Sequence, residues 1–349
     1  MPADRALTRL LGIEAPIALG AFGGLSSVEL TAGVSELGGL GAYGLYGYDA
    51  ARILATAAEL RARTERPFAL NLWLPTGDEV EPGEARLDAT IEAARPIFEA
   101  LGVAVPPLPA RFLPDPAEQL DAVIEARPAV LSLVYGAPGP ELVERCRAAG
   151  IRLMGTATTV DEAVVLERSG VDIVVASGIE AAGHRVSFLR PAEESLVGLV
   201  ALVPQVVDAV SVPVLAAGGI ADRRGVAAAL ALGASGVVVG TAFLRTTASA
   251  ATEAHREAIA ATPAHGSVLT RAMSGRLSRG APNAAVQALE GADIAAFPAQ
   301  NWLTGQFRAE AARQGRGEFL SLWLGQGAPL ARAGELRDVF AELAAGLGG

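Results

Sequence analysis

His184 is, of the three histidines in this 349-residue chain, the one whose surroundings best suit proton transfer. It lies in the segment Ser177–Arg185, where small residues flank it directly after a predicted buried strand. An imidazole with an ordinary pKa near about 6.5 exchanges a proton at neutral pH, so a histidine with little packing to do there is a candidate catalytic base. A structural or surface role is the alternative. It suits His255 and His265 better, because neither has such flanks.

Two glycine-rich turns could hold a phosphate group. The segment Ala217-Gly218-Gly219 follows one predicted strand, and Gly240-Thr241 follows the next. Glycine has no Cβ, so its backbone N–H group can approach an anion closely. Loops after the seventh and eighth strands are where (β/α)8 barrels hold a phosphate. Glycines that only make tight turns are the alternative, which we disfavour because both loops show the feature in the right order.

Other residues near strand ends could contact a cofactor ring or only stabilise the fold. Asn71 lies near the end of an apolar strand and could hydrogen bond to a ring carbonyl or amide; a capping role is the alternative. Thr156 and Ser132 lie in or at the end of predicted strands, where a hydroxyl group often forms its hydrogen bond within the core. The arginine-rich segment Arg271–Gly280 is interpreted as a solvated loop. Three tryptophans are interpreted as packing residues: Trp73, Trp302 and Trp323.

Composition excludes several kinds of chemistry. All 28 basic residues are arginine, which excludes mechanisms that need an active-site lysine. The single cysteine, Cys146, excludes disulfide frameworks, iron–sulfur clusters and cysteine-rich zinc sites, and we expect no metal. The net charge of −10, without a basic cluster, argues against binding to nucleic acid or to an anionic membrane.

The sequence predicts a cytoplasmic protein. Met1–Gly12 has no apolar run of the kind that a secretory signal carries. The uncharged run Val226–Leu244 has the length of a membrane span, but Gly233, Gly236 and Gly240 divide it into helix, turn and strand. We expect a small-molecule substrate as partner, and the sequence leaves open whether the chain is a monomer or a homodimer.

Short apolar runs alternate with amphipathic segments along the chain, which is typical of βαβ units. The predicted strands are Pro16–Gly20, Leu40–Gly44, Phe68–Trp73, Ala129–Val134, Arg152–Thr156, Ile173–Ala176, Val214–Ala216 and Gly236–Val239. The predicted helices between them are Val28–Leu37, Asp49–Thr64, Glu118–Arg127, Pro140–Ala149, Val160–Ser169, Glu193–Val207 and Arg223–Leu232. Several strands are continuous apolar runs, which indicates burial on both faces. Eight parallel strands with helices between them favour an α/β fold of the (β/α)8, or TIM, barrel type.

Two stretches do not fit the repeating unit and are interpreted as insertions. The first is rich in proline and contains a predicted helix, Glu84–Leu101; the second contains Glu253–Ala261 and Phe307–Gln314. Both follow the carboxyl ends of strands, on the face where barrels carry active sites. We predict a barrel from residues 1–74, 116–244 and 317–349, closed by a last helix, Glu335–Leu347. The smaller helical capping subdomain comprises residues 75–115 and 245–316.

Taken in order, the glycine-rich and polar segments resemble those of the nitronate monooxygenase family, formerly called 2-nitropropane dioxygenases, which are FMN-dependent TIM barrels. The resemblance covers almost the whole chain. The segments that carry it are Pro16–Gly24, Val34–Gly41, Phe68–Asn71, Gly155–Thr158, Glu180–His184, Ala217–Asp222, Gly240–Thr241, Ser274–Arg276 with Arg279, and Gly325–Gly327. The ordered set is specific for the fold and the flavin, although each single segment is weak.

The resemblance implies an FMN whose phosphate lies in the two glycine-rich turns. The implied flavin contacts are Ala21, Phe22, Gly23, Asn71, Thr156, Ser177, Gly178, Gly183, Ala217, Gly218, Gly219, Gly240 and Thr241. The implied substrate pocket comprises Phe22, His184 and Ser274. His184 would act as base on a nitroalkane α-carbon or orient an anionic nitronate. O2 would complete an oxidation that yields a carbonyl compound and nitrite.

Three residues depart from the pattern of the resembled family near the expected substrate pocket. Ala182 stands where the family commonly has glycine, Phe22 where it often has methionine, and Ser177 where many members have glutamine. The physiological substrate therefore stays open. The alternative function is an NAD(P)H-dependent FMN enoyl reductase of the kind that acts on acyl-carrier substrates. A flavin-binding protein without catalysis is less expected, because His184 is present.

Overall fold

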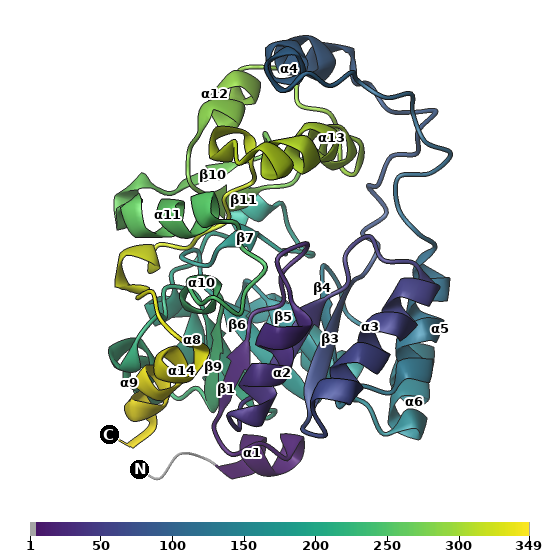
Figure 1. Cartoon of the computed structure of the whole chain (residues 1–349). Helices are drawn as coiled ribbons and strands as arrows, with labels where there is room; N and C mark the ends of the chain where they lie inside the picture. Colours follow the sequence, from purple (N-terminus) through teal and green to yellow (C-terminus); the bar gives the residue numbers. More distant parts are fainter. Residues whose placement is uncertain (1–4, 349) are drawn as a thin grey trace.

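The computed structural model describes residues 5–348 and contains one closed parallel barrel (Figure 1). Its strands are β1 (Ile17–Leu19), β2 (Gly41–Gly44), β3 (Phe68–Trp73), β4 (Val130–Val134), β5 (Arg152–Ala157), β6 (Ile173–Ser177), β8 (Val214–Ala217) and β9 (Gly236–Val239). The 8-stranded order is β1-β9-β8-β6-β5-β4-β3-β2, and a parallel bridge between Ala18 and Leu40 brings β1 back beside β2. The predicted (β/α)8 barrel is confirmed.

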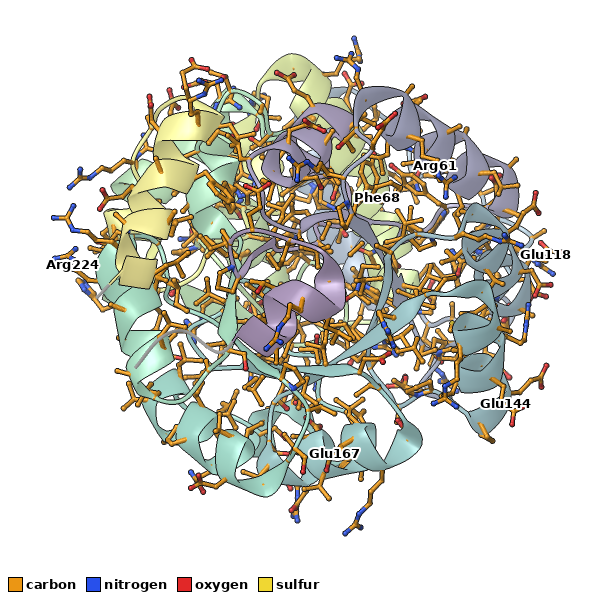
Figure 2. All side chains as sticks on the ribbon, turned by 90° about the horizontal axis from the view of Figure 1, so that it is seen from below. Arg61, Phe68, Glu118, Glu144, Glu167 and Arg224 are labelled. Atoms are coloured by element: carbon orange, nitrogen blue, oxygen red, sulfur yellow. The ribbon has the colours of Figure 1, made fainter. Side chains whose placement is uncertain are left out.

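An outer layer of helices surrounds the strands. It consists of α2 (Val28–Glu36), α3 (Ala50–Arg63), α5 (Pro116–Ala126), α6 (Pro140–Ala149), α7 (Val160–Ser169), α8 (Leu199–Ala209), α9 (Arg223–Ala231) and α14 (Leu336–Ala344). Figure 2, seen from below, shows this ring, with Glu118, Glu144 and Glu167 pointing outward. The short α1 (Arg5–Leu11) lies across the lower end (Figures 1 and 2). The apolar strands are therefore buried on both faces, as a parallel barrel requires.

Side-chain caps explain where several helices begin. Ser27, Asp49, Thr159 and Asp222 each accept a hydrogen bond from a backbone N–H group in the first turn of the following helix. Such a cap satisfies donors that the helix itself leaves unpaired. The predicted helices Pro140–Ala149 and Val160–Ser169 match the observed bounds because each ends at a left-handed glycine.

Three helix predictions are wrong at their first residues. The helix predicted from Glu84 begins at Asp88. The helix predicted from Glu193 begins at Leu199, because Pro191 is followed only by a 3-10 turn and the amide of Leu199 is held by the Glu180 carboxylate. The helix predicted from Phe307 is the second half of α13 (Ala299–Gln314). Its first half carries Gln300 and Thr304, whose buried polar groups are satisfied by hydrogen bonds, so no apolar periodicity marks it.

The segments that we interpreted as insertions form the upper part of the molecule in Figure 1. They contribute α4 (Asp88–Leu101), α11 (Glu253–Ala261), α12 (Ala284–Glu290) and α13, and α4 packs against α12 and α13. This part is not purely helical as predicted. A 3-stranded antiparallel sheet joins β10 (Val268–Thr270), β11 (Ser278–Gly280) and β7 (Gly183–His184). The predicted division into barrel and cap segments stays a proposal, and both its outer ends, 1–4 and 349, lie outside the described residues.

The long uncharged run Val226–Leu244 is divided as predicted. It contains the end of α9, then β9, and then the short helix α10 (Thr241–Leu244). Among the described residues, no helix combines the length and apolar character needed to cross a membrane. The run is thus part of the barrel wall.

Candidate active site

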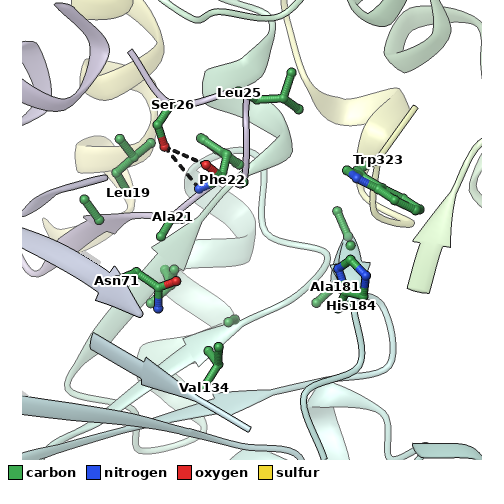
Figure 3. A pocket seen from close by; sticks show the side chains of 18 of the residues that line it. Leu19, Ala21, Phe22, Leu25, Ser26, Asn71, Val134, Ala181, His184 and Trp323 are labelled. Carbon is green, nitrogen blue, oxygen red and sulfur yellow. Dashed lines mark hydrogen bonds between the residues drawn. The ribbon is translucent and has the colours of Figure 1, made fainter. Parts of the chain in front are cut away.

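A cavity of about 710 Å³ opens at the carboxyl ends of the barrel strands (Figure 3). Most residues predicted to contact a cofactor or substrate line it: Ala21, Phe22, Gly23, Asn71, Thr156, Ser177, Gly183, His184, Ala217, Gly218, Gly219, Gly240 and Thr241. Two predicted residues, Gly178 and Ser274, are absent from its lining. A Cβ on Gly178 would lie 2.8 Å from the side chain of Leu199, so this glycine is needed for packing behind the cavity.

Glycines let three backbone segments meet at the cavity: the loop after β8, the loop after β9 and the C-terminal segment. Gly218 and Gly219 have φ angles of 125° and 67°, a conformation that residues with a Cβ rarely adopt. A Cβ on Gly327 would lie 2.5 Å from the carbonyl oxygen of Gly219. The hydroxyl of Thr241 accepts a hydrogen bond of 3.1 Å from the amide of Gly325, so the loop after β9 is tied to the C-terminal segment. The result is a cradle whose surface is largely backbone.

The first loop of the barrel is fixed by one hydroxyl group. Ser26 Oγ donates to the carbonyl of Phe22 over 2.9 Å and accepts from the amides of Phe22 and Gly44 (Figure 3). A Cβ on Gly44 would lie 2.4 Å from the Phe22 carbonyl oxygen, so only glycine permits this approach. The loop that the resemblance assigns to the flavin ring is therefore held in place before any ligand binds.

Asn71 is buried at the carboxyl half of β3 and lines the cavity. Its Nδ2 atom donates to the carbonyl oxygen of Ser132 over 3.1 Å and lies 3.2 Å from the Ser132 hydroxyl. The amide is thus oriented by its neighbouring strand and is not a loop cap, which was the alternative. Its other polar atom is available to a ligand in the cavity.

His184 lies on a strand of the small sheet rather than in a free loop. Strand β7 pairs with β11, so that His184 stands opposite Ser278. Its Nε2 atom is 2.8 Å from the hydroxyl of Ser274, which itself donates to the carbonyl of Arg276 over 3.1 Å. Because a serine has one proton to donate, this arrangement places the imidazole proton on Nε2 and leaves Nδ1 as the acceptor. Ser274 is therefore a partner of His184 although it does not line the cavity.

The pKa of His184 is not ordinary, contrary to our expectation. Burial lowers it to about 3, and the positive charges of Arg276 and Arg308 act in the same direction. The lowered pKa favours the neutral imidazole at neutral pH, and an anion bound beside it would raise the pKa again. The other two histidines have the structural or surface positions that the sequence predicts. His255 is buried and its Nε2 atom is bonded to the carbonyl of Trp323, and His265 is exposed.

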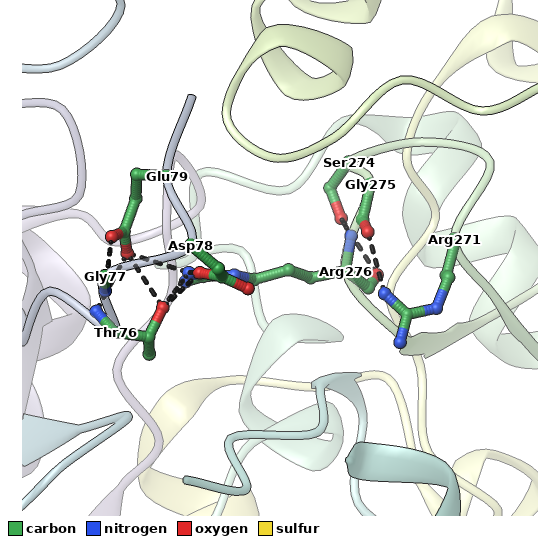
Figure 4. A network of polar contacts seen from close by, with 8 residues as sticks. All are labelled: Thr76, Gly77, Asp78, Glu79, Arg271, Ser274, Gly275 and Arg276. Atoms are coloured by element: carbon green, nitrogen blue, oxygen red, sulfur yellow. Dashed lines mark hydrogen bonds and ion pairs between the residues drawn. The ribbon is translucent and has the colours of Figure 1, made fainter. Parts of the chain in front are cut away.

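The segment Arg271–Gly280 is not a solvated loop, which corrects our interpretation. Arg276 and Arg279 are only 6% and 4% exposed. Arg276 is enclosed by Thr76, Asp78 and Glu79 of the first insertion, at distances of 2.5 to 2.8 Å from its Nη2 atom (Figure 4). The buried guanidinium groups are tolerated because carboxylates and carbonyls satisfy them.

Ion pairs between Arg276 of the second insertion and Asp78 and Glu79 of the first join the two insertions. Burial alone would raise the pKa of Asp78, but hydrogen bonds from Thr76 and Arg276 lower it below its ordinary value. The same holds for Glu79, whose pKa is lowered by Thr76 and Arg276 against the effect of burial. Both carboxylates therefore stay ionised and keep Arg276 in place beside the cavity.

Aromatic rings form the wall around His184. The ring centroids of Trp73 and Trp323 lie 4.9 and 5.6 Å from that of His184. Trp73 also contacts Tyr46 at 4.5 Å and Tyr135 at 4.9 Å. Trp73 and Trp323 are packing residues, as the sequence predicts, but they pack against the candidate catalytic residue. Their position could not be inferred because β3 and the C-terminal segment are distant in sequence.

Arg308 is a candidate site residue that the sequence analysis missed. It lines the cavity from α13, and its Nη2 atom donates to the carbonyl oxygen and to Oδ1 of Asn301 over 3.0 and 2.7 Å. Its Nη1 atom donates to Ser321, and its buried Nε atom has no partner in the described part of the chain. No ion pair of Arg308 is found among residues 5–348, and burial lowers its pKa to about 10. A cation without a carboxylate in a cavity is a candidate site for an anion.

The site thus combines a backbone cradle with an imidazole of lowered pKa, aromatic walls and an arginine that has no ion pair among residues 5–348. Within the described part of the chain, no group of three or more histidine, cysteine, aspartate or glutamate side chains could hold a metal ion. Fold and site together define an enzyme of the (β/α)8-barrel class whose chemistry occurs at the carboxyl ends of the strands.

Comparisons with known proteins agree and are more specific. The model of the nitronate monooxygenase family matches residues 4–346, and the chain belongs to this family of oxidoreductases. A protein from Staphylococcus aureus (strain Newman) described as a probable nitronate monooxygenase is 38% identical over 334 residues, covering 93% of this chain and 92% of that protein.

Two solved structures are similar over nearly the whole chain. Nitroalkane oxidase from Streptomyces ansochromogenes shares 33% identity, with a TM-score of 0.89, and the match covers 98% of this chain and 97% of the other. FabK from Thermotoga maritima shares 27% identity, with a TM-score of 0.74, over 97% and 94% of the two chains. The similarity therefore includes the cap as well as the barrel.

Proposed function

We propose that this protein oxidises alkyl nitronates with bound FMN and O2, giving a carbonyl compound and nitrite. The observation that carries the proposal is that one cavity is lined both by His184, whose pKa is lowered, and by Arg308, for which no ion pair is found among residues 5–348. Membership of the nitronate monooxygenase family and similarity to a protein described as a nitroalkane oxidase support the same reaction class.

The residues at the glycine end fit a flavin mononucleotide. The cavity volume of about 710 Å³ lies within the usual range for cofactor and ligand sites. Gly218, Gly219, Gly240 and Thr241 would hold the phosphate, because left-handed glycines present successive backbone N–H groups that a Cβ would obstruct. Asn71 and the loop through Phe22 would contact the ring. FMN bound there would supply the redox chemistry, taking electrons from the substrate and passing them to O2.

The charges favour an anionic nitronate over a neutral nitroalkane as substrate. Removing a proton from a neutral nitroalkane would form an imidazolium at His184, next to Arg276 and Arg308, which the lowered pKa disfavours. A nitronate carries its negative charge on arrival. Arg308 would neutralise that charge, and His184 would orient the nitronate by hydrogen bonding. The anion would in turn raise the pKa of His184.

The walls of the site determine what else can reach the substrate. Trp73 and Trp323 pack beside the half-buried His184, and these apolar neighbours strengthen the electrostatic effect of Arg308. Ser274 fixes the imidazole through the 2.8 Å contact to Nε2. Residues of this chain thus bind, orient and desolvate the substrate.

The proposal is tested by product analysis. Protein reconstituted with FMN is given an alkyl nitronate, the corresponding neutral nitroalkane, or NADPH with an enone, and O2 uptake and nitrite are measured. We expect nitrite and O2 uptake with the nitronate, much slower turnover of the nitroalkane and no enone reduction. Rapid enone reduction without nitrite would instead establish the reductase alternative.

A further inference from the structure

We propose that a second cavity beside the main one receives the apolar tail of the substrate, and that Trp73 is the movable partition between them. The inference rests on the proposed function, because it places the charged head of the substrate at His184. It adds a substrate class: nitronates with an extended alkyl or aryl group.

The second cavity has a volume of about 300 Å³ and an apolar lining. Leu74, Val80, Phe112 and Leu113 line it from the first insertion and the end of β3, and Phe297 lines it from the second insertion. Its volume is at the lower end of the usual range for ligand pockets. It can hold an alkyl chain of several carbons or a single aromatic ring.

The charged residues around the second cavity do not favour a charged ligand. Arg276 and Glu79 both line it, but they form an ion pair of 2.8 Å. Gln119 is engaged as well, since its Nε2 atom donates to the carbonyl of Tyr48 over 2.6 Å. Glu81 also lines the cavity, but it is exposed to solvent and keeps its hydration. The remaining favourable interaction inside the cavity is the burial of apolar surface.

One layer of aromatic rings separates the second cavity from His184. Tyr46 and Trp73 are the residues that line both cavities. On one side the Trp73 ring lies 4.9 Å from His184, and on the other it stacks on Phe297 at 5.8 Å. A substrate group that extends away from His184 therefore meets Trp73 first and the second cavity directly behind it.

The two partition residues are held differently. The hydroxyl of Tyr46 accepts a hydrogen bond of 2.9 Å from Asn301, which anchors its ring. The Trp73 indole is held by ring contacts alone, because the hydrogen bonds among residues 5–348 include none from its N–H group. Trp73 can change its side-chain rotamer without breaking a hydrogen bond, and its movement would join the two cavities.

A chain-length series tests the proposal. We would measure kcat/KM of the FMN-loaded enzyme for nitronates from nitroethane to 1-nitrooctane. Each methylene buried in the second cavity should raise kcat/KM by up to about fourfold until the cavity is full. Moving the Trp73 side chain costs free energy. The increase in kcat/KM should therefore be smaller for the first methylenes that reach Trp73.

Two matched variants locate the effect. Leu113→Trp fills the second cavity and should abolish the gain with chain length while leaving ethyl nitronate oxidation unchanged. Leu108→Trp makes the same change in the same loop at a side chain that is 49% exposed and lines neither cavity, so it should keep the gain. Trp73→Ala, which joins the cavities, should increase the preference for long chains.

The outcomes separate this inference from the proposed function. Equal kcat/KM for all chain lengths, or a gain that survives Leu113→Trp, would overturn the role of the second cavity while leaving nitronate oxidation intact. If no nitronate is oxidised, the proposed function fails. In that case we would test the second cavity by calorimetry, comparing the binding of octanoate with that of acetate. Both are carboxylates that imitate the nitronate head. Tighter binding of octanoate that is lost in Leu113→Trp would support the cavity, and equal binding would overturn it.

Discussion

The two ends of the main cavity are built in different ways. At the phosphate end, Gly218, Gly219 and Gly240 present backbone, and each glycine belongs to a short segment directly after a strand. At the His184 end, side chains meet from distant parts of the chain: Trp73 from β3, Arg308 from α13 and Trp323 near the C-terminus. Under the proposed function, cofactor binding would depend on backbone conformation, and substrate recognition on charge and ring packing. Variants at the two ends should therefore fail in different ways.

The largest effect is expected from His184→Ala. Loss of the group that orients the substrate should lower kcat/KM for an alkyl nitronate by about 100- to 1,000-fold, as for other preorganised hydrogen-bond groups. FMN binding should change much less than turnover, because His184 is not one of the glycine-rich turns that form the cradle. Steady-state kinetics and FMN titration check both statements, with the exposed His265→Ala as control. Activity within twofold of the wild type would remove His184 from the mechanism.

Arg308→Met should lower kcat/KM for a nitronate by about 100-fold, since a buried charge pairing with an anionic ligand is lost. Turnover of the neutral nitroalkane should fall much less. Arg313→Met is the matched control on the same helix, because Arg313 pairs with Glu310 at the surface. A parallel loss for both substrates would show that Arg308 supports the fold rather than the anion.

Acid should destabilise the substrate end through His184. Its pKa is about 3 when folded and about 6.5 when unfolded, so below pH 6.5 the unfolded chain binds a proton that the folded chain does not. Stability is therefore lost as the pH falls, by about 2 kcal/mol between pH 6.5 and pH 5. Asp78 and Glu79 also lose stabilisation in acid, but near and below their ordinary pKa values of about 4.

Urea denaturation of the wild type and of His184→Gln at pH 7 and pH 5 measures this contribution. The variant should lose less stability than the wild type over this interval. Equal losses in the two proteins would show that the imidazole titrates normally, and would weaken the electrostatic argument for an anionic substrate.

The smallest effect is expected at the phosphate end. Gly219→Ala and Gly102→Ala place alanine at closely matched φ angles of 67° and 69°. Both should lose about 1–2 kcal/mol of stability from backbone strain. Only Gly219→Ala should also weaken FMN binding, by about tenfold, as measured by quenching of FMN fluorescence. Unchanged FMN affinity in Gly219→Ala would contradict the cradle.

The same contrast explains how much could be predicted from the sequence. The barrel strands were predictable because continuous apolar runs such as Ile173–Ala176 require burial on both faces. The cradle was predictable because its glycines follow strands directly. Strand β7 was not, since two residues carry no periodicity and pair with β11 almost a hundred residues later.

Arg308 and the buried Arg276 were not predictable for a related reason. Whether an arginine is solvated or buried depends on partners that only the fold assembles, such as Asp78, Glu79 and Asn301. The pKa of His184 depends on these same arginines and on burial. Residue type and spacing identified the histidine but not its protonation state.

An anaerobic visible spectrum tests the central claim most directly. The FMN-loaded protein would be mixed without O2 with an alkyl nitronate, with the neutral nitroalkane at the same concentration, or with NADPH. We predict rapid loss of the oxidised flavin absorbance with the nitronate, a far slower change with the nitroalkane and none with NADPH. Equal rates for nitronate and nitroalkane, or bleaching by NADPH alone, would contradict the account of a site in which Arg308 and a neutral His184 receive an anion.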